Sequence, residues 1–274
     1  MTHPHLATPA GKTRARALGI PFNGTPGANN AITDIPGTEV GYCTLIEGEG
    51  PLVVGQGPIR TGVTAIIPRG KAKAAWPVWA GQTSLNGNGE LTGSWWIEEA
   101  GHCDGPLTIT NTHSCGFHVK KEHVFAAIDN AQGGPIEEGS VGGGTGMMLY
   151  GHKGGSGTAS RVVDYEGESY TVGAFVQANF GLRSQLTVGG IPMAEHLPGS
   201  DPYDSDTGSI IAMVGTDAPL VSHQCKRLAR RISLGVGRGG SISGHGSGDI
   251  FMAFSTAGSD ALQDHDALIP LNIV

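Results

Sequence analysis

The sequence predicts a layered α/β fold in which a few helices cover a mixed β-sheet. Short β-branched segments recur along the 274-residue chain, two segments carry apolar residues at helical spacing, and turn residues separate these segments. Such patterns are typical of layered α/β domains, but they leave the strand order and the number of sheets open. No internal repeat and no Pro/Ser-rich linker divides the chain, so we expect one domain over residues 1–274.

Strands are predicted where apolar and β-branched residues are bounded by Gly, Pro or Asn. The predicted strands are residues 40–46, 61–67, 107–110, 170–176, 209–214 and 250–255. The first follows a turn-rich stretch that begins at Asn30. Residues 1–19 show no such pattern, and we expect them to form a loose arm.

Helices are predicted over residues 121–130 and 221–232. In the first, Val124, Ala127 and Ile128 fall on one side, and in the second the apolar residues recur with the same spacing. One polar face of the second helix carries Lys226, Arg227, Arg230 and Arg231.

Composition narrows the range of functions. The net charge of −7 and the scattered basic residues argue against nucleic acid as a partner, and no apolar run approaches the roughly 20 residues of a membrane helix. The four cysteines form no CxxC pair and no signal-peptide pattern precedes them, so we expect reduced, mostly buried thiols and a cytoplasmic protein. The 46 glycines have no three-residue period and indicate tight turns and close backbone approaches.

The segment Gly208-Ser209 stands between a polar loop and an apolar strand. The strand would hold the Ser209 hydroxyl while the loop could depart, which is the arrangement that an N-terminal nucleophile needs. Glycine before the serine leaves its carbonyl open to attack by the hydroxyl. The freed α-amine, whose pKa in a simple peptide is about 7.7 to 8.0, would then serve as the base for the same serine. The alternative interpretation is a simple turn before a strand.

Three further segments carry polar or backbone groups that suit acyl transfer. Successive N–H groups at Gly143 and Gly144 would form an oxyanion hole, or these glycines would pack between sheet layers. In an extended segment, Ser247 and Asp249 point to the same side and would contact one amine, although the segment also suits a hairpin turn. Asn179, at the end of a predicted strand, would donate to an oxyanion or simply end the strand.

Other catalytic arrangements are poorly supported. The eleven histidines include no HExxH pair and no ligand set of convincing spacing, so no metal and no cofactor is predicted. No serine lies in a GxSxG elbow, which argues against an α/β-hydrolase triad.

Several ordered motifs resemble those of one family. They include Gly-Thr-Pro-Gly at 24–27, Asn-Ala-Ile-Thr-Asp at 30–34, Arg-Thr-Gly-Val-Thr at 60–64, Asn-Gly-Asn-Gly-Glu-Leu-Thr-Gly at 86–93, Thr-Asn-Thr-His-Ser at 110–114, Glu-Gly-Ser-Val-Gly-Gly-Gly-Thr-Gly-Met at 138–147, Lys-Gly-Gly-Ser-Gly-Thr-Ala-Ser-Arg at 153–161, Gly-Ser-Ile-Ile at 208–211 and Thr-Asp-Ala-Pro-Leu at 216–220. Over residues 17–274 the chain resembles the DmpA-like D-aminopeptidases and β-aminopeptidases of peptidase family S58, which cleave themselves at a Gly-Ser bond.

The resemblance implies a four-layer αββα sandwich, similar to that of the ornithine acetyltransferases, and assembly into a homo-oligomer. It implies that Ser209 is the nucleophile, freed by cleavage after Gly208 into subunits 1–208 and 209–274. Asn179 would stabilise the oxyanion, and Ser247 and Asp249 would orient the amine, with Asp249 standing where the family has Glu.

The chain departs from the family at two places. Ser114-Cys115-Gly116 runs directly into Phe117-His118-Val119, where the family has a Glu-x-Tyr-Asp-Gly segment, and the family continues into a helix beyond the position of Val274. The leading prediction is a serine aminopeptidase or amidase that acts on small peptides and amino-acid amides. The alternatives are an acyltransferase on the same scaffold and an inactive paralogue that serves as a binding or structural subunit.

Overall fold

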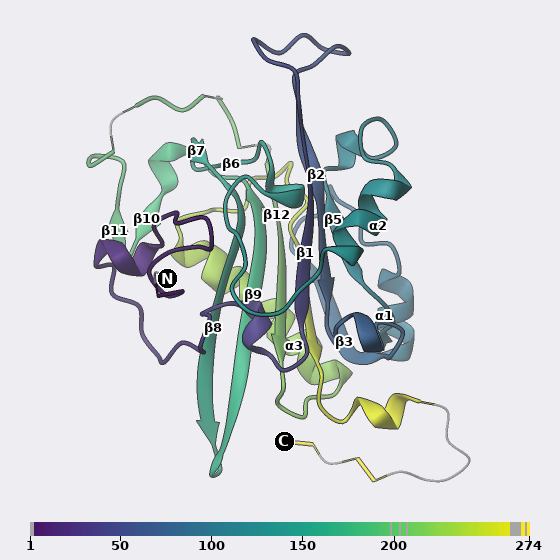
Figure 1. Cartoon of the computed structure of the whole chain (residues 1–274). Helices are drawn as coiled ribbons and strands as arrows, with labels where there is room; N and C mark the ends of the chain where they lie inside the picture. The colour runs from purple at the N-terminus through teal and green to yellow at the C-terminus, as the bar shows by residue number, and fades with distance from the viewer. Residues whose placement is uncertain (1–2, 198, 203, 207, 264–269, 272) are drawn as a thin grey trace.

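A six-stranded mixed sheet forms the centre of the chain in a computed structural model that describes residues 3–197, 199–202, 204–206, 208–263, 270–271 and 273–274 (Figure 1). Its strand order is β4-β3-β13-β12-β9-β8. In sequence order the strands are β3 (Val78–Ser84), β4 (His102–Cys103), β8 (Gly155–Tyr165), β9 (Glu168–Asn179), β12 (Ser209–Thr216) and β13 (Ile250–Ser255). Strands β12 and β13 are parallel, and the other neighbouring pairs are antiparallel.

A second, antiparallel sheet has the order β1-β2-β5 and comprises β1 (Glu39–Glu47), β2 (Ile59–Ile67) and β5 (Leu107–Thr110). Two short hairpins pair β6 (Met148–Leu149) with β7 (His152–Lys153) and β10 (Thr187–Val188) with β11 (Ile191–Pro192). The α-helices are α1 (Ser94–Ala100), α2 (Lys121–Asp129) and α3 (Ser222–Arg238).

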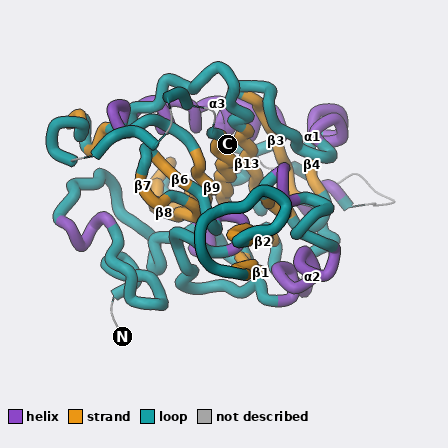
Figure 2. The backbone as a smooth tube through the Cα atoms, turned by 90° about the horizontal axis from the view of Figure 1, so that it is seen from above, coloured by secondary structure: helices purple, strands orange, loops and turns teal. Residues whose placement is uncertain are grey.

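Four layers pack in the order helix, sheet, sheet, helix (Figure 2). Helix α3 covers β3 and β13 through a core that includes Cys225, Ala229 and Phe251. On the other side of the large sheet, a second core around Phe254 joins it to the small sheet. Helix α2 closes the outer face of the small sheet by packing against β1 and β2, with Ala127 fully buried. The expected αββα sandwich is therefore confirmed.

The parallel pair β12 and β13 explains the position of α3. Parallel neighbours need a crossover connection, and α3 supplies it between the two strands. All six residues of β13 are buried, as a strand covered on both faces requires. Burial of this pair fixes the N-terminal end of β12, where Ser209 lies.

Most predicted elements are present. The bounds of β5 and β13 match the prediction, and the predicted strands at β1, β2, β9 and β12 are each extended by a few residues. Helix α2 ends one residue before its predicted end, and α3 begins one residue later and ends six residues later than predicted. Helix α1 and strands β3 and β8 were not predicted. Strand β8 begins inside a glycine-rich run at Gly155, where glycines predict a loop more strongly than a strand.

The prediction that residues 1–19 form a loose arm is wrong for the described part, because Arg14 fastens it. The guanidinium of Arg14 is buried and donates to the backbone carbonyls of Pro4, Asn29, Asn30 and Thr158 at 2.6–3.1 Å. It also forms an ion pair with Glu138 at 2.7 Å. Together with contacts of His5 and Lys12 to Gly27 and Glu138, this buried side chain holds a segment that has little apolar content of its own.

Several other predictions can be compared with the structure. The four cysteines are free, with Cys103 and Cys225 buried, Cys43 half-buried and Cys115 exposed. The predicted polar face of the second helix lies on α3, where three of its four basic residues are exposed. Within the described residues, no helix has the length and apolar character needed to cross a membrane.

Replacing Arg14 should destabilise the protein although the residue belongs to no helix or strand. Arg14→Ala leaves Glu138 without its cation and several carbonyls without a donor, so we expect the free energy of unfolding to fall by about 3 kcal/mol. Urea denaturation measures this change. The matched control is Arg230→Ala at an exposed position of α3. An equal, small effect of both variants would contradict the fastening role of Arg14.

Candidate active site

Ser209 is the first residue of β12 and lies between β9 and the segment that leads into β13. In the antiparallel ladder it is paired with Asn179, the last residue of β9. Its Oγ accepts a hydrogen bond from the backbone N–H of Gly248 at 2.9 Å. Because the hydroxyl already accepts this bond, its own proton remains available to a base.

The side chain of Asn179 is oriented by a backbone group. Its Oδ1 accepts from the N–H of Met148 at 2.9 Å, which requires the oxygen rather than the nitrogen of the amide to face Met148. Its Nδ2 makes no hydrogen bond within the described part of the chain. The amide group can therefore donate to an anion that forms beside Ser209.

Ser247 and Asp249 form a buried hydrogen-bonded pair. The Oγ of Ser247 donates to Oδ2 of Asp249 at 3.0 Å, and each residue is only 2% exposed. The other carboxylate oxygen of Asp249 accepts from the N–H of Ile210 at 3.1 Å. Asp249 therefore binds the backbone of the residue that directly follows Ser209.

Asn86 extends this network and was not among the predicted site residues. Its Nδ2 donates to Ser247 Oγ at 2.7 Å and to the carbonyl of Gly244 at 3.2 Å. With Asn86 as donor, the Ser247 hydroxyl is left to donate to Asp249. The only sequence signal was its place at the start of the 86–93 motif, which does not reveal a partner 161 positions away.

Burial raises the pKa of the Asp249 carboxyl, and the negative charge of Asp206 acts in the same direction. The hydrogen bonds from Ile210, Ser247 and Asn86 act in the opposite direction, because they stabilise the carboxylate. Burial is the largest of these effects. The ionised acid therefore costs stability, which suggests that it is retained for another reason.

Gly208 packs directly against the chain that pairs with Ser209. A Cβ atom built on Gly208 would overlap the carbonyl oxygen of Asn179 and crowd the Cα of Phe180. Only glycine fits this position without displacing the segment from β9. The structure thus gives a steric reason for the Gly-Ser pair that the sequence shows.

The structure does not support Gly143 and Gly144 as oxyanion donors. Both lie in a buried 3₁₀ turn, where Gly143 N–H donates to Thr64 Oγ1 at 3.1 Å and Gly144 N–H donates to the carbonyl of Val141 at 3.0 Å. A Cβ on Gly143 would overlap the Gln177 side chain, so these glycines are explained by close packing between the sheets. Of the predicted site residues, Ser209, Asn179, Ser247, Asp249 and Gly208 come together and these two glycines do not.

The stretch from Ser114 to Val119 closes as a compact turn. The backbone N–H groups of Phe117, His118 and Val119 all approach the carbonyl of Ser114 at 3.0–3.2 Å, and Gly116 N–H donates to Val119. Backbone hydrogen bonds thus order the connection between β5 and α2. Phe117, within this turn, is 82% exposed.

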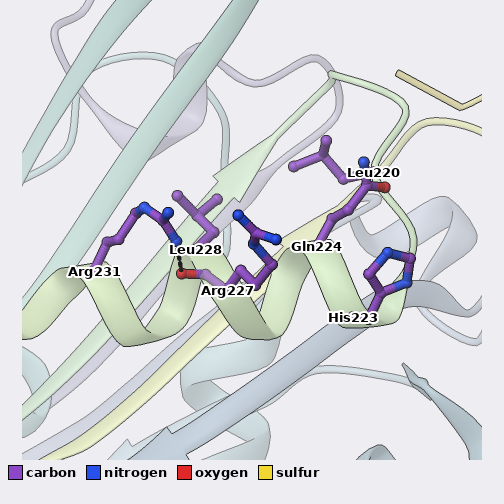
Figure 3. Close-up of a pocket in the computed structure, with 6 residues that line it drawn as sticks. All are labelled: Leu220, His223, Gln224, Arg227, Leu228 and Arg231. Carbon is purple, nitrogen blue, oxygen red and sulfur yellow. Dashed lines mark hydrogen bonds between the residues drawn. The ribbon is translucent and has the colours of Figure 1, made fainter.

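A hollow of about 450 Å³ lies on the outer side of α3, away from Ser209 and the residues around it (Figure 3). It is lined by Leu220, His223, Gln224, Arg227, Leu228 and Arg231. Leu220 follows the C-terminal end of β12, whereas Ser209 begins that strand. In the described part of the chain, no group of three or more His, Cys, Asp or Glu residues is placed to hold a metal ion.

The four-layer fold, with a serine at the start of a central strand, defines the class as a hydrolase with an Ntn-type fold. The chain belongs to Peptidase family S58, which it matches over residues 30–118 and 115–270.

Relatives agree with this assignment. The chain is 48% identical over 301 aligned positions to the beta-peptidyl aminopeptidase BapA of Sphingosinicella microcystinivorans, covering 90% of this chain and 75% of that protein. It is similar to the solved L-aminopeptidase D-Ala-esterase/amidase of Ochrobactrum anthropi, described as a prototype serine aminopeptidase with a variant Ntn hydrolase fold (TM-score 0.88, 42% identity, 95% of this chain and 83% of that one). A beta-aminopeptidase of Burkholderia sp. is also similar (TM-score 0.84, 41% identity, 96% and 84%). The predicted aminopeptidase or amidase function is confirmed at this level.

The raised pKa of Asp249 gives a pH-dependent prediction. A carboxyl with a raised folded-state pKa loses protons first in the unfolded chain, so its stability contribution falls as pH rises from about 4 toward the folded value. Asp249→Asn should therefore gain stability relative to the parent over that window. Thermal unfolding at several pH values measures the difference.

The same substitution should impair function, because Asn offers one acceptor oxygen where Asp249 uses two. We expect at least a hundredfold loss of activity together with equal or higher stability near neutral pH. A parallel loss of both properties would contradict this explanation.

Proposed function

We propose that the chain cleaves itself between Gly208 and Ser209 and then acts as a serine aminopeptidase with Ser209 as its nucleophile. The observation that carries the proposal is the placement of Ser209 opposite Asn179 and beside the Asp249 network, at the first position of a buried strand. Cleavage would turn the backbone nitrogen of Ser209 into an α-amine on the same residue as the hydroxyl. An α-amine ordinarily has a pKa of about 7.7 to 8.0, which suits a general base near neutral pH.

In the proposed turnover, the α-amine takes the proton from Ser209 Oγ as the oxygen attacks the substrate carbonyl. Asn179 Nδ2 donates to the oxyanion, since its Oδ1 is already engaged by Met148. One such donor is worth about 2.7–4 kcal/mol of transition-state stabilisation. The leaving amine departs with the proton, and water then hydrolyses the ester on Ser209.

Ser247 and Asp249 are proposed to orient the α-amine. Asp249 binds the N–H of Ile210, which places its carboxylate next to the backbone at Ser209. Ser247 is held by both Asn86 and Asp249, so its hydroxyl has little freedom to rotate. A fixed hydroxyl and carboxylate would hold the amine with its lone pair toward Ser209 Oγ.

The proposed substrate is a small peptide or amide with a free N-terminal β-amino acid. Support comes from the relatives, since two aligned proteins are named beta-peptidyl aminopeptidase and a similar solved structure is a beta-aminopeptidase. The Ochrobactrum anthropi relative is named for an L-aminopeptidase activity, so substrates with an N-terminal L-α-amino acid are the class to compare with β-amino acid substrates.

The second candidate is an inactive scaffold that binds a partner or substrate without cleaving it. The turn at residues 114–119 favours it, because the family's Glu-x-Tyr segment is expected at this place. In agreement, the alignment with the first relative runs over 301 positions although this chain has 274 residues, and the family match divides at residues 115–118. Without the hydroxyl of that tyrosine, the transition state would lose about as much stabilisation as it loses when an oxyanion-hole donor is removed.

We also propose that residues 1–274 form one domain, that the protein is a homo-oligomer and that it resides in the cytoplasm. Exposed apolar side chains such as Leu52, Val54 and Trp95 support association, and free cysteines suit a reducing compartment. Light scattering of the purified chain measures the oligomeric state.

Ser209→Ala should abolish both proposed reactions. We expect the parent chain to divide into fragments 1–208 and 209–274 and to hydrolyse a β-aminoacyl p-nitroanilide, while the variant stays intact and inactive because it lacks the attacking oxygen. Intact mass and release of p-nitroaniline measure the two outcomes. The matched control is Ser205→Ala, an exposed serine of the same loop. An uncut, inactive parent would favour the scaffold, and turnover by Ser209→Ala would refute the proposed nucleophile.

Gly208→Ala should slow self-cleavage even though alanine adds one methyl group. The new Cβ overlaps the Asn179 carbonyl, so the scissile peptide must move away from Ser209 Oγ. We expect fragment 209–274 to appear at least tenfold more slowly. Intact mass, recorded over time, measures this rate. Gly246→Ala is the control, because its Cβ would meet no atom within 4 Å. Equal rates for both variants would contradict the steric argument.

A further inference from the structure

Self-cleavage needs a base other than the one used in turnover. In the uncut chain the nitrogen of Ser209 belongs to the Gly208–Ser209 amide, which has no basic lone pair. The Ser209 hydroxyl accepts from Gly248 N–H and still has a proton to lose. The residue that accepts this proton must therefore be another group near the scissile bond.

Asp249 is poorly suited to this task, because both of its oxygens are occupied. Oδ1 accepts from Ile210 N–H at 3.1 Å and Oδ2 accepts from Ser247 Oγ at 3.0 Å. A proton taken up by either oxygen would remove the negative charge that strengthens both of these hydrogen bonds.

Asp206 has the geometry that Asp249 lacks. Its Oδ1 accepts from the N–H of Gly208 at 3.2 Å, on the acyl side of the scissile bond. Its Oδ2 is buried and has no hydrogen-bond partner among the described residues. A buried carboxylate oxygen without a donor is costly, and such exceptions call for an explanation.

Two contacts place Asp206 inside the site rather than on the loop surface. A Cβ built on Gly244 would lie 3.1 Å from Asp206 Cβ and 3.2 Å from its Cγ, and the carbonyl of Gly244 accepts from Asn86. The charge of Asp206 also contributes, as the smallest of the causes, to the raised pKa of Asp249. Asp206 therefore faces the network that surrounds Ser209.

We propose that Asp206 is the proton acceptor for self-cleavage, so that the departing loop carries the base for its own removal. This inference rests on the self-cleavage proposed above. Asp206 Oδ1 holds Gly208 through its N–H, and Oδ2 takes the Ser209 proton directly or through one water molecule.

The steps balance as an N-to-O acyl shift followed by hydrolysis. Ser209 Oγ bonds to the carbonyl carbon of Gly208 as its proton passes to Asp206, and the C–N bond then breaks as Asp206 returns the proton to the Ser209 nitrogen. Water adds to the resulting ester carbon, and Oγ leaves with a proton. The products are a carboxylate at Gly208 and a free amine at Ser209.

The products also explain how the loop would leave. The new carboxylate of Gly208 forms two residues from Asp206, whose Oδ1 accepts from the N–H of the same glycine. Like charges at such separations repel strongly where water is partly excluded. Cleavage thus converts the contact that holds Gly208 into one that expels it.

The test follows self-cleavage of the full chain made by cell-free translation, with fragments 1–208 and 209–274 measured by intact mass. Asp206→Asn keeps an acceptor for Gly208 N–H but cannot take up the proton, so we expect cleavage to slow by a hundredfold or more. Asp206→Glu should stay within about tenfold of the parent, because it keeps the carboxylate. Asp204→Asn is the control, since it removes the same charge from an exposed position of the same loop.

A fold control separates chemistry from damage. Uncut Asp206→Asn should unfold at the same temperature as uncut Ser209→Ala. Cleavage of Asp206→Asn at the rate of the parent would overturn the inference alone, as would slowing that comes with a lowered unfolding temperature and is not restored by Asp206→Glu. An uncut parent chain would instead refute the proposed self-cleavage, before any variant is compared.

Discussion

The hydrogen-bonded ladder of β9, β12 and β13 is the constraint on which the site depends. Its register sets Ser209 opposite Asn179 on one side and Ile211 opposite Ile250 on the other. Asp249, one residue before that second pair, thereby reaches the N–H of Ile210. A slip of one residue would turn every side chain of the strand to the other face of the sheet and separate these groups. Full burial of β13 makes such a slip costly.

The same ladder explains how a chain cut after Gly208 would remain one body. Every residue of β12, from Ser209 to Thr216, is paired with β9, although the two strands lie on opposite sides of the proposed cut. Helix α3 and β13 follow β12 in sequence and share apolar cores with residues from the earlier part of the chain. Burial of this apolar surface, at about 25 cal/mol per Å², does not depend on the continuity of the chain. Cleavage would therefore free an amine without dividing the sheet.

The sequence predicts this fold well where local patterns determine the structure and poorly where distant contacts do. Strands β5 and β13 are recovered because turn residues bound compact β-branched runs. Strand β8 is missed because glycines, which here permit close packing, ordinarily indicate a loop. The N-terminal arm is misjudged because Arg14 and other polar groups bind partners that are distant in sequence. Likewise Ser209, Asn179, Ser247 and Asp249 stand out at strand ends. The hydrogen-bond partners of Asn86 and Asp206 are identified only in the folded structure. The N–H groups of Gly143 and Gly144 are already hydrogen-bonded within the protein.

The electrostatics of the uncut and cut states differ in a way that gives the reaction a direction. In the uncut chain, burial and, to a smaller extent, the negative charge of Asp206 raise the pKa of Asp249. In the proposed product, the loop that carries Asp206 is expelled and an α-amine appears beside Asp249. A carboxylate that was opposed by a like charge would then be paired with a cation, which favours its ionised form and raises the basicity of the amine. The ionised Asp249 thus destabilises the precursor and stabilises the α-amine in the product, which provides the reason to keep an ionisable residue at this position.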